Sequence, residues 1–141
     1  MTHATPEVIA RGLLIENGSV LVCRNIAKGY AYLPGGHIDP GETAAAALAR
    51  EFTEECGLAV TVGDCLLVSE LLADGPHEIN LVFHVERRGD DAVESSEDHI
   101  AFDWLDLGAV VDADLRPTSI RAWIASGGTS ENDRVGFVSE A

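Results

Sequence analysis

The chain has 141 residues, 46% of them hydrophobic and 23% charged, a composition that encloses one hydrophobic core and fits one domain. Its 24 acidic and 9 basic residues give a formal net charge of −15, which repels phosphate backbones and disfavours nucleic acid as a general partner. No apolar run approaches the roughly 20 residues that span a bilayer, and the N-terminus lacks a signal-like segment, so we expect a cytoplasmic protein with no membrane partner.

The chain begins with a predicted β-hairpin. β-Branched and aliphatic residues from Val8 to Ile15 predict a strand, and Asn17-Gly18 favours a tight turn with left-handed backbone conformations. The strand pattern resumes from Ser19 to Arg24. A loop is expected from Asn25 to Tyr30, and a short segment then leads into Pro34-Gly35-Gly36, where the backbone can approach another group closely.

A helix is predicted in the next segment. Thr43 is a suitable N-cap, and the alanine-rich run from Ala44 to Ala49 strongly favours helix. Gly57 can adopt the left-handed conformation that ends a helix. We therefore expect one helix from residue 44 to about residue 56.

Strands follow the helix. Ala59 to Leu72 predicts one or two strands interrupted near Gly63-Asp64, and Asp74-Gly75-Pro76 predicts a turn. From His77 to Arg88, apolar and polar residues alternate, which predicts a strand with one buried face. Ile100 to Leu105 predicts a short strand after an acidic loop.

One late helix completes the predicted domain. Pro117 to Ala125 predicts a helix with its proline in the first turn. Residues 1–126 are therefore assigned to one domain and residues 127–141 to a flexible C-terminal tail, although Val135 to Val138 could add a strand. Strands with one central and one late helix predict a mixed α/β sandwich.

Three cysteines, Cys23, Cys56 and Cys65, lie in apolar contexts without metal-type spacing. We expect them to be reduced thiols in the core.

Three glutamates share one face near the end of the central helix. At about 100° per residue, Glu51, Glu54 and Glu55 project within an arc of about 100°. Negative charge at a helix C-terminus opposes the helix dipole, which costs about 0.3–1 kcal/mol per group. An exposed acidic surface would carry this cost without function, whereas a divalent cation such as Mg²⁺ or Mn²⁺ would convert the repulsion into coordination.

The segment GHIDPGETAAAALAREFTEECGL resembles the signature of the Nudix hydrolase family, whose MutT-like members share one motif. That motif is Gly, five residues, Glu, seven residues, Arg-Glu, an aliphatic or aromatic residue, any residue, Glu-Glu, any residue, Gly and an apolar residue. All nine positions are met, by Gly36, Glu42, Arg50, Glu51, Phe52, Glu54, Glu55, Gly57 and Leu58. The likeness extends with falling specificity over roughly residues 7 to 126.

The resemblance implies a Nudix-type α/β/α sandwich with a mixed, largely antiparallel sheet. It also implies hydrolysis of a nucleoside diphosphate linked to another moiety, with Mg²⁺ or Mn²⁺. Glu51, Glu54 and Glu55 would hold the metal together with the Gly36 carbonyl, and Arg50 would orient a glutamate by a salt bridge. Glu42 would support the site.

The implied mechanism is attack of water on a phosphorus atom, with a glutamate removing the proton. We favour Glu51 or Glu54 as this base and keep three acidic residues of the loop as less favoured alternatives. These are Glu94, Glu97 and Asp98.

Substrate contacts are expected from Arg24 and from the loop that ends at Tyr32. Tyr30 or Tyr32 could stack on a base, although an aromatic residue beside a Pro-Gly turn more often packs. Nucleotide sugars, ADP-ribose, nucleoside triphosphates and dinucleoside polyphosphates all stay open as substrates.

Two other functions stay open: a module that senses a nucleotide without cleaving it, and a diphosphate isomerase, which would require a catalytic cysteine in a pocket. The intact motif favours hydrolysis over the sensor, since a sensor has no need of every acid. A homodimer is common among similar proteins, but no stretch identifies an interface.

Overall fold

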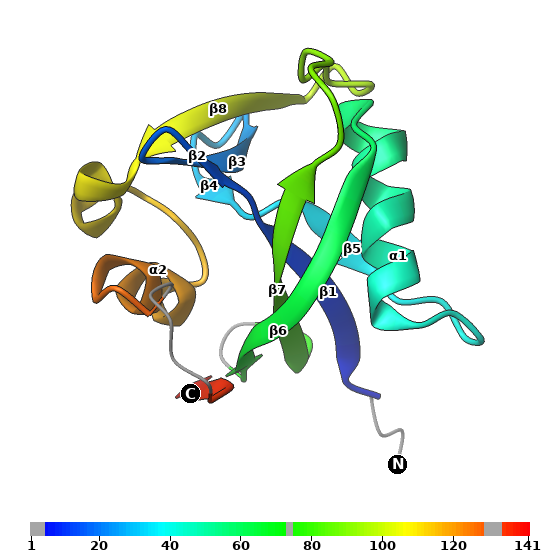
Figure 1. The fold of residues 1–141 in the computed structure, drawn as a ribbon. Coiled ribbons are helices and arrows are strands. Elements are labelled where there is room, and N and C mark those ends of the chain that lie inside the picture. Colours follow the sequence, from blue (N-terminus) through cyan, green and yellow to red (C-terminus); the bar gives the residue numbers. More distant parts are fainter. Residues whose placement is uncertain (1–4, 73–74, 129–133) are drawn as a thin grey trace.

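The computed structural model describes residues 5–72, 75–128 and 134–141. Asp74 of the predicted turn and residues 129–133 of the predicted tail lie outside the described residues. The described chain forms two β-sheets, with helix α1 (Ala44–Glu51) and helix α2 (Thr118–Ala125) on opposite sides of the strands (Figure 1).

The N-terminal hairpin is confirmed and connects the two sheets. Asn17 and Gly18 have φ angles of 52° and 78°, and this turn joins β2 (Ile15–Glu16) to β3 (Ser19–Asn25). The predicted first strand is divided at Leu14, because β1 (Glu7–Leu13) pairs in one sheet and β2 in the other.

The larger sheet has the order β5-β1-β7-β6-β9. Its further strands are β5 (Gly35–His37), β6 (Val60–Leu71), β7 (Glu78–Arg87) and β9 (Gly136–Glu140). β1 pairs with β7 and β6 pairs with β9 in parallel, whereas β1–β5 and β6–β7 are antiparallel.

The smaller sheet is antiparallel and centres on β3. This strand pairs with β2, with β4 (Ala31–Tyr32) and with β8 (Ile100–Asp106). The predicted fold class, an α/β/α sandwich with a mixed and largely antiparallel sheet, is confirmed.

Each helix covers its own hydrophobic core. On α1 and the turn after it, Leu48 and Phe52 pack in one core with Ala10. On α2, Ile120 and Ile124 pack in the other core with residues from β1, β3, β6 and β7. The late helix begins one residue later than predicted, because the extended Pro117 occupies its N-cap position. A 3₁₀ helix, η2 (Leu107–Asp112), precedes it and was not predicted.

Two predicted strands differ from their patterns in informative ways. β6 is continuous, and the predicted interruption at Gly63-Asp64 is a β-bulge, seen as a register shift between Val62 and Cys65. In β7, Asn80 was expected on the polar face but is only 1% exposed. Val82, on the same face as Asn80, packs in one core and Val85 packs in the other, so both faces are covered along this part of β7, and a solvent side appears only further on, at the exposed His84 and Glu86.

The C-terminal segment requires a correction. The expected flexible tail includes β9, which pairs with β6 from Leu67 to Leu71. This strand agrees with the alternative of a short strand near residues 135–138. No helix within the described ranges is long and apolar enough to cross a membrane.

All three cysteines are free thiols. Cys23 and Cys56 are buried and Cys65 is half-buried. Burial raises the pKa of Cys56 to about 12 and raises the pKa of the other two thiols, so the expectation of reduced core thiols is met for Cys23 and Cys56.

Candidate functional site

The acidic helix has the predicted caps and an unpredicted wide turn. Thr43 Oγ1 accepts a hydrogen bond from the Ala46 N–H at 3.1 Å, and Gly57 ends the segment with φ 69°. Between them, residues Phe52–Cys56 form a π-helical turn, η1, after α1 ends at Glu51. Glu54 and Glu55 therefore lie in a wider turn than the 100° spacing assumed, and π-helical turns are frequent at functional sites.

Arg50 connects the acids of this site. It donates to Glu42 through two nitrogen atoms, with 3.1 Å from Nε to Oε2 and 2.7 Å from Nη2 to Oε1. Its Nη1 donates to Glu51 at 3.1 Å and to Glu54 at 3.2 Å. Hydrogen bonding to Arg50 lowers the pKa of Glu42, and the same bonds raise the pKa of Arg50. The guanidinium thus bonds to three carboxylates and also lies 3.5 Å from a fourth, that of Asp39, which extends the single salt bridge expected for it.

Glu51 is the last residue of α1 and Glu55 lies within the π-helical turn, and their carboxyl groups are close to each other. The pKa of Glu55 is raised to about 7, first by burial and then by the charge and hydrogen bonding of Glu51, with a further contribution from Glu97. A Cβ placed on Gly36 would lie 2.6 Å from Oε1 of Glu51. Glycine therefore lets the β5 backbone lie against this carboxylate, which a larger residue would displace.

These residues suit a hard divalent cation by their chemistry. Glu51 and Glu55 are two close carboxylates, and Glu55 resists ionisation. Arg50 bonds to Glu51, whereas Glu55 forms no ion pair within the described ranges, so a cation would supply the positive charge that Glu55 lacks. Within the described residues, no three His, Cys, Asp or Glu side chains are already arranged as a metal site. Glu54 instead contacts Arg50 and is 58% exposed, so it has room to turn toward the Glu51–Glu55 pair.

The acidic loop after β7 lies against the end of this helix. Its backbone N–H groups at Glu94 and Ser96 donate to the carbonyls of Cys56 and Glu55, at 3.1 and 3.2 Å. Ser96 Oγ donates to the Glu54 carbonyl at 2.8 Å. These bonds satisfy carbonyls that a helix end leaves unpaired. They also bring Glu97, one of the less favoured candidates for the base, close enough to raise the pKa of Glu55.

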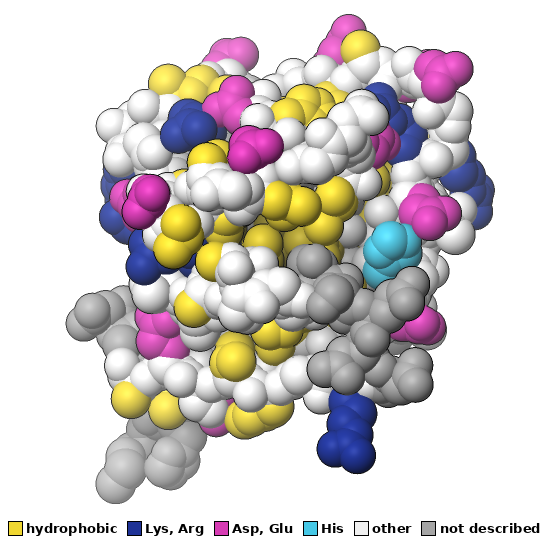
Figure 2. All heavy atoms as spheres, turned by 60° about the vertical axis from the view of Figure 1, so that its left-hand side comes forward, with side chains coloured by type: hydrophobic (Ala, Val, Ile, Leu, Met, Phe, Trp, Pro, Cys, Tyr) yellow, Lys and Arg dark blue, Asp and Glu magenta, His cyan; other side chains and the backbone are white. Residues whose placement is uncertain are grey.

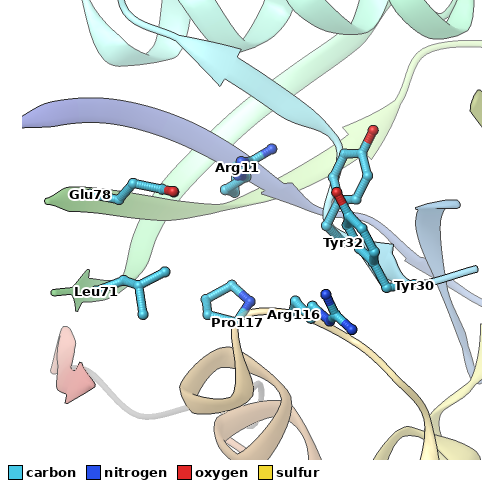
Figure 3. Close-up of a pocket in the computed structure, with 7 residues that line it drawn as sticks. All are labelled: Arg11, Tyr30, Tyr32, Leu71, Glu78, Arg116 and Pro117. Atoms are coloured by element: carbon cyan, nitrogen blue, oxygen red, sulfur yellow. The ribbon is translucent and has the colours of Figure 1, made fainter. Parts of the chain in front are cut away.

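A cavity of about 430 Å³ is separate from the acids, none of which lines it. It is lined by Arg11, Tyr30, Tyr32, Leu71, Glu78, Arg116 and Pro117 (Figure 3). In Figure 3, Glu78 lies on the side of the cavity opposite the two tyrosines, with Arg11 between these walls. Figure 2 shows the side of the molecule that carries α2, where hydrophobic side chains gather near the centre and charged side chains lie around them.

One short segment links the cavity to the acids. Tyr32 lines the cavity, and four residues later Gly36 lies against Glu51. Along β1, Arg11 pairs with Gly35 and donates from Nη1 to the Leu33 carbonyl at 3.1 Å. The segment from Tyr32 to Gly36 therefore runs from the cavity to the Glu51 carboxylate.

The two residues predicted to contact substrate differ in position. Tyr32 lines the cavity, as does Tyr30. Arg24 is absent from the cavity lining, because its Nε donates to Asp103 at 2.6 Å on the neighbouring strand β8. Its role in substrate binding stays a prediction.

Sequence reasoning missed Arg11, Glu78 and Arg116. The available signal for Arg11 was a single charge within the apolar run of the first strand. None of the three cysteines lines this cavity, so the structure gives no support to the cysteine-dependent isomerase.

Comparison with known proteins places the chain in a family. Residues 6–125 match the model of the NUDIX domain. The chain is 30% identical over 130 residues to a protein named putative 8-oxo-dGTP diphosphatase 2 from Mycobacterium tuberculosis (strain CDC 1551 / Oshkosh), covering 84% of this chain and 86% of that protein. It is also 34% identical over 101 residues to an ADP-ribose pyrophosphatase from Methanocaldococcus jannaschii, covering 64% of this chain and 60% of that protein.

Solved structures agree on the fold. The MutT protein from Methanosarcina mazei Go1 superimposes with a TM-score of 0.78 at 24% identity, over 95% of this chain and 100% of that chain. An ADP-ribose pyrophosphatase from Streptococcus suis 89-1591 superimposes with a TM-score of 0.73 at 20% identity, over 94% of this chain and 99% of that chain.

Proposed function

Since this chain belongs to the Nudix family and is a hydrolase acting on acid anhydrides, we propose that it cleaves the phosphoanhydride of a nucleoside diphosphate linked to another moiety, with Mg²⁺ or Mn²⁺. The observation that carries this proposal is the short path from the cavity to the acids. Arg11 and Tyr32 line the cavity, and the backbone between Tyr32 and Gly36 ends against Glu51. A nucleoside in the cavity would place its diphosphate beside the carboxylates.

Glu51, Glu54 and Glu55 would hold the cation, with the Gly36 carbonyl as a further ligand. A bound divalent cation supplies Lewis-acid polarisation of a phosphoryl oxygen and lowers the pKa of water. It also offsets the repulsion between a diphosphate and a protein with a net charge of −15.

The chain itself positions the reacting groups. Arg50 bonds to Glu42, Glu51 and Glu54 and so limits the motion of these carboxylates. Glu51 or Glu54 would accept the proton of the attacking water, since each is a carboxylate that Arg50 holds in the acidic site. The C-terminal end of the helix is in turn fixed by the acidic loop through Ser96.

A substrate panel tests this function. Purified protein is incubated with Mg²⁺ and with nucleotide sugars, ADP-ribose, nucleoside triphosphates or dinucleoside polyphosphates, and the products are identified by mass spectrometry in ¹⁸O-labelled water. We expect the label in one of the two phosphate-containing products, according to which phosphorus the water attacks, and we expect EDTA to stop the reaction. Tight nucleotide binding without cleavage in any of these reactions would support the sensing module instead.

A matched pair of variants assigns the reaction to the acidic helix. Glu54→Gln removes a carboxylate from the site, whereas Glu86→Gln removes one from β7, where Glu86 contacts His84. We expect only the first substitution to reduce turnover. Equal activity in both variants would show that cleavage arises elsewhere or from a contaminant.

A further inference from the structure

Arg11 is a partly buried cation held by neutral groups. Its Nε donates to Asn80 Oδ1 at 3.3 Å, and its Nη1 donates to the Leu33 carbonyl. Within the described part of the chain, it forms no ion pair with a carboxylate. Four other arginines do contact an acid: Arg24, Arg50, Arg87 and Arg116.

The support for Arg11 is itself unfavourable for folding. Burial lowers the pKa of Arg11, and Asn80 is 1% exposed with its Nδ2 lacking a partner among the described residues. A buried amide donor without an acceptor destabilises a fold. An aspartate at position 80 would pair with Arg11 and cancel its charge, whereas asparagine positions the guanidinium and leaves the charge available to a ligand.

Glu78 faces the same cavity and is also without a partner. It has no ion pair and no side-chain hydrogen bond within the described ranges, although its charge is close enough to act on the pKa of Arg11. The two opposite charges line one cavity without closing onto each other (Figure 3). The space between them suits a ligand edge that carries both an acceptor and a donor.

The opposite wall of the cavity is aromatic. The rings of Tyr30 and Tyr32 lie 6.0 Å apart between centroids, and the Arg11 guanidinium lies 5.6 Å from the centroid of Tyr32. Arg116 lies 4.5 Å from the centroid of Tyr30 and is held by Asp114 at 3.0 Å. A flat heteroaromatic ring is the group that such a wall favours.

We propose that this cavity holds the nucleobase and that Arg11 and Glu78 select a 6-keto purine, that is, a guanine-type base. The proposal rests on the function given above. Guanine offers acceptors at O6 and N7, which match the donors of Arg11, and N–H donors at N1 and N2, which match the Glu78 carboxylate. Adenine presents an amino donor at position 6, which would face the guanidinium. The aromatic wall and the cavity volume favour a purine over the smaller pyrimidines.

Paired substrates test this selection directly. kcat/KM is measured with Mg²⁺ for GTP against ATP, and for a GDP-sugar against the ADP derivative of the same sugar. We expect a preference for guanine of about tenfold or more, the discrimination that one good base contact provides. A preference for adenine, uracil or cytosine, or no preference, overturns the inference.

Substitutions then assign the preference to its residues. Arg11→Gln and Glu78→Gln should each reduce the guanine-to-adenine ratio toward one, mainly through KM. Glu86→Gln serves as the charge-matched control. If Arg11→Gln does not fold, as shown by its melting curve, Glu78→Gln decides alone. An unchanged ratio in a folded Glu78→Gln protein contradicts the assignment.

Failure of this inference is distinguishable from failure of the proposed function. Cleavage of nucleotides without selection for guanine rejects only the base assignment. If no nucleotide is cleaved, isothermal titration with GMP and AMP still measures the base preference of the cavity, and equal or absent binding rejects it.

Discussion

Gly36 and Glu51 are in direct contact across the β5–α1 junction, and a Cβ on residue 36 would lie 2.6 Å from the Glu51 carboxylate. Gly36→Ala should therefore displace Glu51 while leaving the backbone conformation allowed. We expect a loss of kcat on the order of a hundredfold, because a shift of about 1 Å in a reacting group has an effect of that size. Steady-state kinetics with the preferred nucleotide measures it. The shorter acid in Gly36→Ala/Glu51→Asp should recover part of the loss, and a fully active Gly36→Ala enzyme would remove Glu51 from the site.

Glu54→Gln should reduce turnover by at least about a hundredfold if Glu54 holds metal or acts as the base. Its side chain is 58% exposed and contacts Arg50, so the melting temperature should change little. Titration calorimetry separates the two roles: a metal ligand loses Mg²⁺ affinity when substituted, whereas a base loses only kcat. Near-normal turnover would reject both roles.

The elements that depend on neighbouring residues alone were predictable. The Asn17-Gly18 turn and the caps at Thr43 and Gly57 are local devices, and the structure has each of them. The π-helical turn was not predictable from a 3.6-residue period, because the period assumes the α-helical spacing that this turn departs from.

The cavity depends on contacts that no local pattern encodes. Arg11 and Asn80 are 69 residues apart and meet only because β1 and β7 pair in parallel. The same strand pairing, together with cover on both faces of β7, buries Asn80 on the face that alternation assigned to solvent. Conversely, Arg24 was expected to contact substrate from the end of the second predicted strand but contacts Asp103, which β8 brings to β3.

Glu55→Gln should stabilise the metal-free protein at alkaline pH. The folded-state pKa of Glu55 is raised from 4.5 to about 7, so the protonated carboxyl is favoured by folding. The protonated Glu55 carboxyl contributes fully to the free energy of unfolding below about pH 4.5, and this contribution is lost as the pH rises to about 7. We expect the free energy of unfolding of the wild type to fall relative to Glu55→Gln by on the order of 1 kcal/mol over that interval, less than the full shift implies because the side chain is partly solvated.

Urea denaturation in EDTA at pH 4.5, 6 and 8 measures this difference between the two proteins. Because the comparison is made at each pH, changes from the many other acids cancel. Saturating Mg²⁺ should restore the wild type at pH 8 and act less on Glu55→Gln. A difference that is constant with pH would show that Glu55 titrates normally.

Glu42→Gln should lower activity more than stability. The amide keeps the shape of Glu42 but replaces the charge-assisted bonds at 3.1 and 2.7 Å that hold Arg50, which in turn holds Glu51 and Glu54. Loss of a residue that supports metal ligands typically reduces activity by about 10- to 100-fold. Metal titrations of activity should show a raised Mg²⁺ requirement, with a melting temperature within about 4 °C of the wild type. A matching loss of both activity and fold would assign Glu42 a purely structural role.

Asn80→Asp should weaken nucleotide binding without removing the catalytic acids. The new carboxylate would lie where Oδ1 now accepts from Arg11 at 3.3 Å, and the resulting ion pair would cancel the charge that Arg11 presents to the cavity. We expect KM for a guanine nucleotide to rise by about tenfold with kcat nearly unchanged, and the guanine-to-adenine ratio to fall. Asn80→Leu is the matched control, because it also removes the amide but adds no charge. If both variants change only the melting temperature and leave the guanine-to-adenine ratio of kcat/KM intact, Asn80 supports only the fold. The absence of a carboxylate beside Arg11 then has no part in recognition of the base.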